Sequence, residues 1–97
     1  MKFEWDPGKE SVNRRKHGVT FWEACYVFAD EHMLTLYDQE HAENEERWIT
    51  IGQTPNGKIL VVIRTYKASK GEQSVRIISA RKATRMEEKK YLERRRR

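Results

Sequence analysis

Residues 59–66 read Ile-Leu-Val-Val-Ile-Arg-Thr-Tyr, and this stretch decides the fold. Five consecutive apolar residues leave no polar face, which is typical of a central strand covered on both sides. A turn at 54–57 (Thr-Pro-Asn-Gly) precedes the stretch and contains a glycine able to adopt positive φ. Residues 47–51, before the turn, form another predicted strand, and a connection this short predicts antiparallel pairing.

Three more strands are predicted on either side of this pair. Residues 33–37 come before it, residues 75–81 come after it, and residues 3–5 alternate in polarity near the start of the chain. We expect residues 67–73 to form a long loop between the last two strands. Together these segments predict an antiparallel sheet of four or five strands.

Capping residues mark three helices. Asp6 and Pro7 suit the start of a first helix, and Gly18 suits its end after the basic cluster at 14–17. A capping box at 20–23 starts a second helix over 21–29. Its buried face is predicted from apolar residues at helical spacing: Phe21, Ala24, Cys25 and Phe28.

A third helix is predicted from about residue 85, after the capping box at 84–87, and its apolar stripe is weak. The full order is then βααββββα. This order predicts one α+β domain over residues 1–97, with two N-terminal helices and a C-terminal helix packed on the sheet.

The composition indicates a small core inside a charged, basic surface. Hydrophobic residues make up 37% and charged residues 36%, and 20 basic against 15 acidic residues give a net charge of +5. A basic balance favours a polyanionic partner, most often nucleic acid, although a solvated surface with a charged tail gives the same balance. The single cysteine, Cys25, excludes an internal disulfide and lies in the apolar stripe, which favours a core role over a nucleophile. With no leader and no apolar run of ~18 residues, we expect a cytoplasmic protein without membrane contact.

The sequence lacks the residue patterns of several kinds of catalytic site. One cysteine and three scattered histidines show no zinc spacing, so we expect no metal and no cofactor. The alternative is a hard-cation site in one acidic segment: His41, Glu43, Glu45 and Glu46. The sequence contains no phosphate-binding glycine loop and no nucleophile elbow.

Basic and hydroxyl residues on the last two strands remain as candidates. If side chains alternate regularly, Ile77, Ser79 and Arg81 face one way and Arg76, Ile78 and Ala80 face the other. On the preceding strand, Thr65 and Lys67 share the face of Ile63, with Arg64 and Tyr66 opposite. Pairing would then gather cations and hydroxyls where Thr65, Lys67 and Arg76 meet, a pattern suited to phosphate. The alternative is that these are strand ends meeting water.

Four segments, taken in order, resemble the motifs of one family, the BrnT-type toxins. The N-terminal signature is similar at 3–7 (Phe-Glu-Trp-Asp-Pro) and 13–21 (Asn-Arg-Arg-Lys-His-Gly-Val-Thr-Phe), and the central motif at 45–52 (Glu-Glu-Arg-Trp-Ile-Thr-Ile-Gly). Residues 60–62 and 76–84 resemble the remaining two. One departure is Lys67, which stands where the family segment has Arg and would give up bidentate phosphate binding.

The resemblance implies a RelE-like fold and RNA cleavage that blocks translation. It also implies neutralisation by a cognate BrnA-like antitoxin of the ribbon-helix-helix type. That antitoxin binds operator DNA, so the toxin would reach DNA only through it and the complex would repress its own operon. RNA is then the expected substrate, with the ribosome as a further candidate partner.

Metal-independent RNA cleavage needs a base, an acid and cations around the phosphate. We assign the reaction to His17, Lys16, Arg81 and Ser79, since histidine is the side chain most often used as a general acid or base. Phosphate binding is assigned to Thr65, Lys67, Arg76 and Arg64. Antitoxin binding is assigned to Trp22 and Trp48, because exposed tryptophans are favoured at interfaces, although both could lie in the core. The alternatives are a protein that binds nucleic acid or the ribosome without cutting, and an inert toxin kept for operon control.

Overall fold

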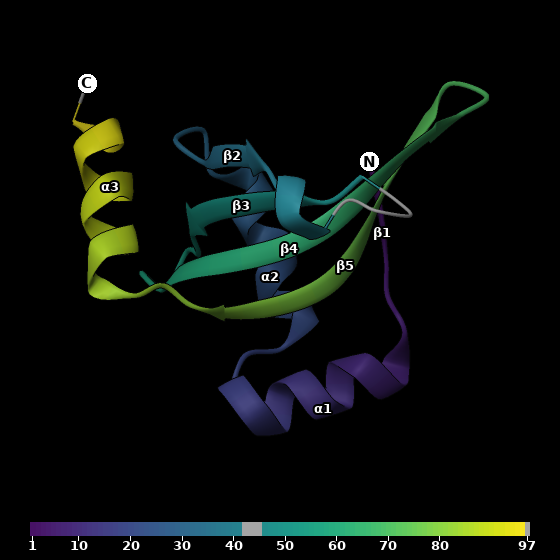
Figure 1. Ribbon diagram of the computed structural model, residues 1–97, viewed down its shortest axis with the longest axis horizontal. Coiled ribbons are helices and arrows are strands. Elements are labelled where there is room, and N and C mark those ends of the chain that lie inside the picture. The colour runs from purple at the N-terminus through teal and green to yellow at the C-terminus, as the bar shows by residue number, and fades with distance from the viewer. Residues whose placement is uncertain (42–45, 97) are drawn as a thin grey trace.

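A computed structural model of the chain describes residues 1–41 and 46–96, without the side chains of 41 and 67–69. The predicted order βααββββα is confirmed, with two short 3-10 helices added (Figure 1). In chain order the elements are β1 (Lys2–Glu4), α1 (Pro7–His17), α2 (Phe21–Cys25), η1 (Tyr26–Ala29), β2 (Leu34–Tyr37), η2 (Gln39–His41), β3 (Trp48–Gln53), β4 (Ile59–Ser69), β5 (Glu72–Lys82) and α3 (Arg85–Arg95).

The sheet has five strands in the order β1-β5-β4-β3-β2. Strands β2 to β5 pair antiparallel with their chain neighbours, as their short connections predict. The prediction of a wholly antiparallel sheet is wrong at one edge, where β1 runs parallel to β5. The argument from short loops does not reach β1, because two helices and three strands separate it from β5.

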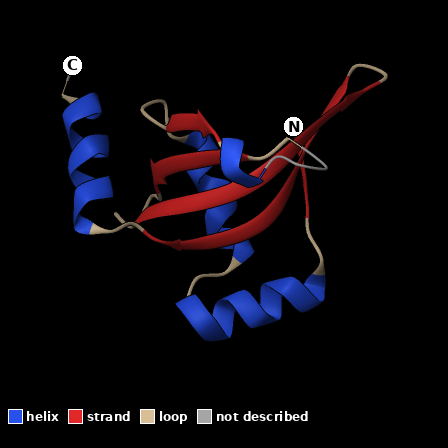
Figure 2. Cartoon of the chain, in the orientation of Figure 1, coloured by secondary structure: helices blue, strands red, loops and turns tan. Residues whose placement is uncertain are grey.

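Both faces of β4 are covered, as its apolar run predicts. Leu60 and Val62 pack in one core with α2 residues such as Phe21, while Ile59 and Val61 pack in a second core with Tyr91 of α3. Figure 2 shows α2 passing behind the sheet and α3 standing at its left end. We call these the α2 face and the α3 face of the sheet.

The regular alternation predicted for β5 is wrong because the strand contains a β-bulge. Ser79 pairs with Ile63 and Ile77 pairs with Arg64, so Ile78 is an extra residue. The extra residue shifts the alternation by one, and Ile77 and Ala80 therefore lie in the same core cluster. On β4, which has no bulge, the predicted separation of Ile63 from Arg64 holds: Ile63 packs with the second core and Arg64 lies over Phe28.

The predicted long loop at 67–73 is instead a continuation of the β4–β5 hairpin. The strands pair as far as Ser69 and Glu72, leaving a connection of two residues. Lys70 and Gly71 both have positive φ, at 51° and 77°. A two-residue turn with two positive φ values matches the twist of the flanking strands, so a tight hairpin replaces the loop.

The second predicted helix is α-helical only as far as Cys25 and continues as the 3-10 helix η1. The change of pitch turns Val27 into the core, where it is fully buried against Gly52 of β3. A Cβ atom at position 52 would lie 2.7 Å from Val27 Cγ1, so glycine is required there. The predicted stripe is confirmed: Phe21 and Ala24 are fully buried, and Cys25 and Phe28 pack at the edge of the same core.

Cys25 is half-buried, and its thiol donates to the carbonyl of Phe21 over 3.3 Å. Burial raises the pKa of this thiol, which agrees with the core role predicted for it. None of the described helices is long and apolar enough to cross a membrane.

Candidate functional site

Helix α1 carries the basic cluster, and its two ends are fixed as predicted. The Asp6 side chain accepts a hydrogen bond from the Lys9 amide at 2.9 Å, and Pro7 occupies the first turn. At the other end Gly18 adopts φ 69° and its N–H donates to the Arg14 carbonyl at 2.8 Å. The last turn therefore carries Arg14, Arg15, Lys16 and His17.

A single buried side chain, Asn13, sets the position of α1 against the sheet. Its Nδ2 donates to the carbonyls of Ala80 (2.8 Å) and Val19 (3.2 Å), and its Oδ1 accepts from the Ala80 amide (3.2 Å). Strand β1 pairs with β5 only from Ser74 to Arg76, so the Asn13 amide takes the place of a neighbouring strand at Ala80. The sequence pattern does not predict this role of Asn13, because a polar residue on a polar helix gives no signal of burial.

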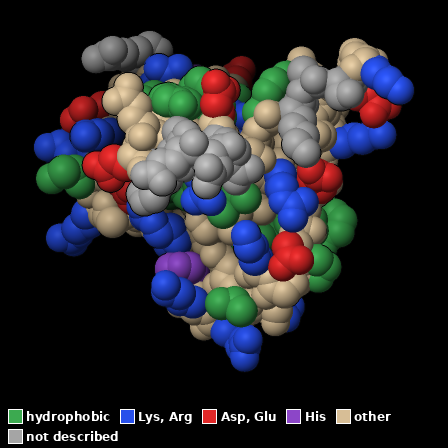
Figure 3. Space-filling model, turned by 45° about the vertical axis from the view of Figure 1, so that its right-hand side comes forward, with side chains coloured by type: hydrophobic (Ala, Val, Ile, Leu, Met, Phe, Trp, Pro, Cys, Tyr) green, Lys and Arg blue, Asp and Glu red, His purple; other side chains and the backbone are tan. Residues whose placement is uncertain are grey.

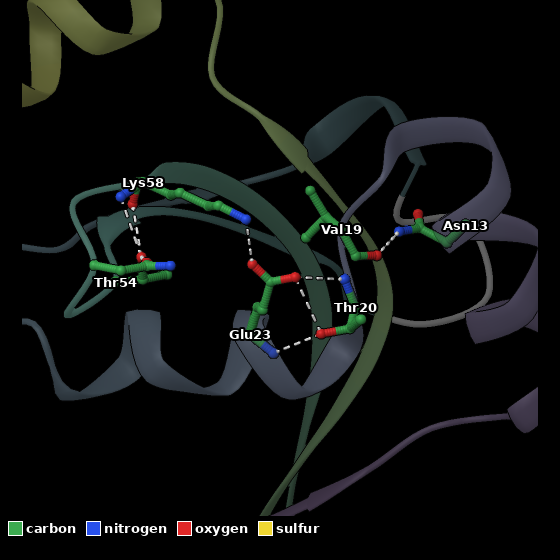
Figure 4. A network of polar contacts seen from close by, with 7 residues as sticks. Asn13, Val19, Thr20, Glu23, Thr54 and Lys58 are labelled. Carbon is green, nitrogen blue, oxygen red and sulfur yellow. Dashed lines mark hydrogen bonds and ion pairs between the residues drawn. The ribbon is translucent and has the colours of Figure 1, made fainter.

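A chain of polar contacts extends from this anchor to the β3–β4 turn (Figure 4). Val19, which accepts from Asn13, precedes the capping box of Thr20 and Glu23. The Glu23 carboxylate also accepts from Lys58 Nζ at 2.8 Å, and this contact holds the pKa of Glu23 below its usual value. The network ties α1, α2 and the turn into one unit.

A groove of about 420 Å³ lies between α1 and the bulged segment of β5. It brings together three of the four predicted catalytic residues, Lys16, His17 and Ser79. The remaining lining residues are Asp6, Gly8, Lys9, Val12, Asn13 and Ile78. Lys9 is a second cation that we did not predict, although positions 9, 13, 16 and 17 share one face of a helix. In Figure 3 a histidine (purple) lies on the lower part of the molecule, where Figure 1 places α1, with Lys and Arg side chains (blue) next to it.

The fourth predicted catalytic residue, Arg81, does not line this groove. Its guanidinium forms two hydrogen bonds with the Glu87 carboxylate, at 2.7 and 2.9 Å, and so joins β5 to the start of α3. The contact with Arg81 lowers the pKa of Glu87 to about 2, and the same contact raises the pKa of Arg81. Arg81 therefore has an acidic partner, which a phosphate would have to displace.

Thr65 and Arg76 meet as predicted, since they are directly opposite each other on β4 and β5. Thr65 is buried, and Arg76 Nη1 lies 3.9 Å from Glu4 Oε1 on β1. The side chain of Lys67, assigned to the same group, lies outside the described residues. Arg76 precedes Ile78 of the groove by two residues, but neither Thr65 nor Arg76 lines the α1–β5 groove.

Arg64 lies on the α2 face of the sheet, away from Thr65. Its guanidinium carbon is 5.3 Å from the centre of the Phe28 ring, and its Nε donates to Thr50 Oγ1 at 3.4 Å. Burial lowers the pKa of Arg64. Trp48 is directly opposite Arg64 on β3 and is half-buried.

The two tryptophans assigned to the antitoxin differ in exposure. Trp22 on α2 is 70% exposed and contacts the Trp5 ring edge-on at 5.1 Å. Tyr26 lies four residues further along and is 57% exposed. Trp22 and Tyr26 thus form an aromatic ridge on the outer side of α2 and η1, whereas Trp48 offers less open surface.

Within residues 1–41 and 46–96, His, Cys, Asp and Glu form no group of three or more that could hold a metal ion. The alternative cation site in the acidic segment falls largely on positions 43 and 45 and on the His41 side chain, which are outside the described residues.

The groove combines an imidazole, two ammonium groups and a hydroxyl, a set able to bind a phosphate and move a proton. A family model for "Ribonuclease toxin, BrnT, of type II toxin-antitoxin system" matches residues 5–87. No curated protein matches the chain. Among solved structures, the ribonuclease toxin BrnT of Brucella abortus is similar, with 26% identity and a TM-score of 0.59 over 88% of this chain and 99% of that one. The chain therefore belongs to the BrnT family of ribonuclease toxins of type II toxin–antitoxin systems.

Proposed function

We propose that the protein is a metal-independent endoribonuclease that blocks translation and that its reaction takes place in the α1–β5 groove. The observation that carries this proposal is the meeting of Lys16, His17 and Ser79 in one groove. These three side chains come from a helix end and a bulged strand, and they offer RNA cleavage a base, a cation and a hydrogen-bond donor, while solvent acts as the acid.

In the proposed reaction the 2′-hydroxyl of one nucleotide attacks the adjacent phosphorus. His17 accepts the proton of the 2′-hydroxyl as the new O–P bond forms. Lys16 and the Ser79 hydroxyl stabilise the negative charge on the phosphorane oxygens. The bond to the 5′-oxygen then breaks, that oxygen takes a proton from solvent, and the products carry a 2′,3′-cyclic phosphate and a 5′-hydroxyl.

Protein refolded free of antitoxin and incubated with total RNA in EDTA tests this reaction. We expect fragments ending in 2′,3′-cyclic phosphate, suppressed when the antitoxin is added back. His17→Ala should lower the cleavage rate about 10²-fold or more, because a positioned acid or base contributes about that much. His32→Ala is the matched control, since His32 lies beside Glu31 and outside the groove. If the protein is folded and arrests growth but leaves the RNA intact, the groove is not a ribonuclease site in the absence of ribosomes. The next assay would then have to contain ribosomes.

Membership of a toxin–antitoxin family implies an antitoxin partner. We propose that a BrnA-like ribbon-helix-helix antitoxin binds the ridge of Trp22 and Tyr26 and that the complex represses the operon through the DNA-binding half. Large exposed aromatic side chains are favoured at such interfaces. Trp22→Ala should weaken antitoxin binding about 30-fold, equivalent to about 2 kcal/mol. Met86→Ala, which changes an equally exposed side chain on α3, is the control.

A further inference from the structure

A row of three π-bearing side chains crosses the α2 face of the sheet on adjacent strands. Tyr37 of β2 is directly opposite Trp48 of β3, and Trp48 is directly opposite Arg64 of β4. Directly opposite residues share a face of the sheet, with Cβ atoms about 5 Å apart. The Tyr37 and Trp48 rings are in contact, with centroids 5.1 Å apart. We call Tyr37, Trp48 and Arg64 the aromatic–arginine row.

Arg64 differs from the paired arginines of the sheet. Arg76 lies near Glu4, and Arg81 binds Glu87. Among the described residues, Arg64 has no carboxylate within ion-pair distance, and its contacts are the Phe28 ring and the Thr50 hydroxyl. A half-buried cation without an acidic partner has lost part of its hydration and gained little charge compensation. An anionic ligand would supply that compensation.

The surface that carries the row is open at Tyr37 and at Tyr66, a neighbour of Arg64 on β4. Tyr37 is 41% exposed at the β2 end. Tyr66, two residues beyond Arg64 and on the same side of β4, is 40% exposed. Trp48 and Arg64 lie between them and are half-buried. Phe28 supports Arg64 from the side and is itself in contact with Phe3, with ring centroids 5.3 Å apart, so the guanidinium rests on an aromatic wall.

We propose that the aromatic–arginine row binds a single-stranded segment of the RNA substrate outside the cleavage groove. Bases would stack on Tyr37 and Trp48, and Arg64 would contact a phosphate on the far side of the base at Trp48. Aromatic rings combined with an arginine are the usual means of holding single-stranded nucleic acid without sequence readout. This proposal rests on RNA being the substrate, as argued above.

The row and the groove lie on either side of the buried residue Ile77 of β5. Arg64 is opposite Ile77 on β5, and the next residue, Ile78, lines the groove. Neighbouring strands are about 4.8 Å apart, so the backbone at Arg64 lies about one strand spacing from the strand that lines the groove. RNA is favoured over a protein partner here because Arg64, which has no carboxylate partner within residues 1–41 and 46–96, lies among the rings. At the Trp22–Tyr26 ridge the nearby Lys58 is already paired with Glu23.

A non-cleavable probe separates binding from catalysis. A short fluorescent oligodeoxyribonucleotide lacks the 2′-hydroxyl that the proposed reaction needs, so its affinity can be measured with the active protein by fluorescence anisotropy. We expect Trp48→Leu to weaken binding about tenfold and Trp48→Phe to restore most of it, because phenylalanine keeps a stacking face. Arg64→Gln should weaken binding about fivefold and reduce the salt slope by about one unit, and Arg85→Gln, an exposed charge on α3, is the control.

The outcomes distinguish this proposal from the proposed function. Suppose that the wild-type protein cleaves RNA and that Arg64→Gln and Trp48→Leu bind the probe as tightly as wild type does. This result would overturn the row as an RNA site and leave the proposed ribonuclease activity standing. Loss of probe binding without any RNA cleavage by wild type would support the row and count against the ribonuclease. Unchanged probe binding with weakened antitoxin binding would identify the row as a protein interface and overturn the proposal. If Trp48→Leu does not fold by circular dichroism, Arg64→Gln and Arg64→Lys decide the question.

Discussion

Helices α1 and α3 have the same length and the same polar character, but they are attached to the sheet in different ways. Each has 11 residues, and each buries one side chain, Asn13 in α1 and Tyr91 in α3. Asn13 exchanges hydrogen bonds with the backbone at the edge of β5. Tyr91 inserts its ring into a core with Ile51, Ile59 and Val61.

The Tyr91 hydroxyl also donates to the Asp30 carboxylate. Burial and this contact raise the pKa of Tyr91 to about 12. Burial opposes the charge on Asp30, but hydrogen bonds from Tyr91 and from the amides of Gln53 (2.8 Å) and His32 (2.9 Å) outweigh it and lower its pKa. The anchor of α1 is thus directional and fixes the groove, whereas the anchor of α3 is mainly buried apolar area. Losing the first should cost function, and losing the second should cost stability.

The largest effect is expected from Tyr91→Ala. Removing a fully buried aromatic ring costs about 3–5 kcal/mol, since the lost apolar burial adds to the cavity left behind. Urea unfolding followed by circular dichroism measures the loss. Met86→Ala, on the same helix but exposed, should change the free energy of unfolding by less than about 0.5 kcal/mol.

We also expect the folded Tyr91→Ala protein to keep its cleavage activity, because the groove is lined by no residue of α3. A specific activity more than tenfold below that of wild type, measured on protein shown to be folded, would mean that α3 takes part in the reaction.

The next effect is expected from Asn13→Asp. An aspartate keeps the shape of the side chain but cannot donate to the carbonyls of Ala80 and Val19, and it brings a charge into a buried position. We expect a loss of about 2–3 kcal/mol in stability together with a loss of RNA cleavage, because Lys16 and His17 are positioned by this helix. Val12→Ala, which alters an exposed side chain on α1, is the stability control. A destabilised but fully active Asn13→Asp protein would show that the groove does not depend on this anchor.

Periodicity and capping predicted most of the fold. The apolar run at 59–63 and the helical stripe from Phe21 give clear signals in the sequence because each covers a large apolar surface. The β5 bulge and the tight turn at Lys70-Gly71 could not be predicted in this way, since each depends on one backbone conformation rather than on a pattern of side chains. The anchors Asn13 and Tyr91 are single buried residues on polar helices, and one residue gives no periodicity.

Only part of the candidate site was predicted, because some of its residues are brought together by packing rather than by their spacing in the sequence. Lys16 and His17 lie next to each other at a helix end, so their joint presence in one groove follows from local sequence. Ser79 reaches the same groove only through the packing of α1 on β5. Arg81 shares a face of β5 with Ser79, as strand alternation predicts, but its guanidinium binds Glu87, and that pairing depends on where α3 begins.

The smallest effect is expected from Glu87→Gln, which weakens the second attachment of α3. Folding lowers the pKa of Glu87 from 4.5 to about 2 through its contact with Arg81, so the carboxylate stabilises the native state above about pH 4.5, and this stabilisation is lost as the pH falls toward 2. Because the pair is partly exposed, we expect the variant to lose about 1–2 kcal/mol at pH 7 and to approach wild type near pH 2. Urea unfolding at pH 7, 4.5 and 2.5 measures this convergence, with Glu93→Gln, an exposed carboxylate on the same helix, as the control.

The difference in the free energy of unfolding between Glu87→Gln and wild type could instead stay constant over this pH range. The pair would then hold α3 by its shape rather than by its charge. The contrast between a polar anchor on α1 and an apolar anchor on α3 would then be sharper, since α3 would have no electrostatic attachment at its N-terminal end.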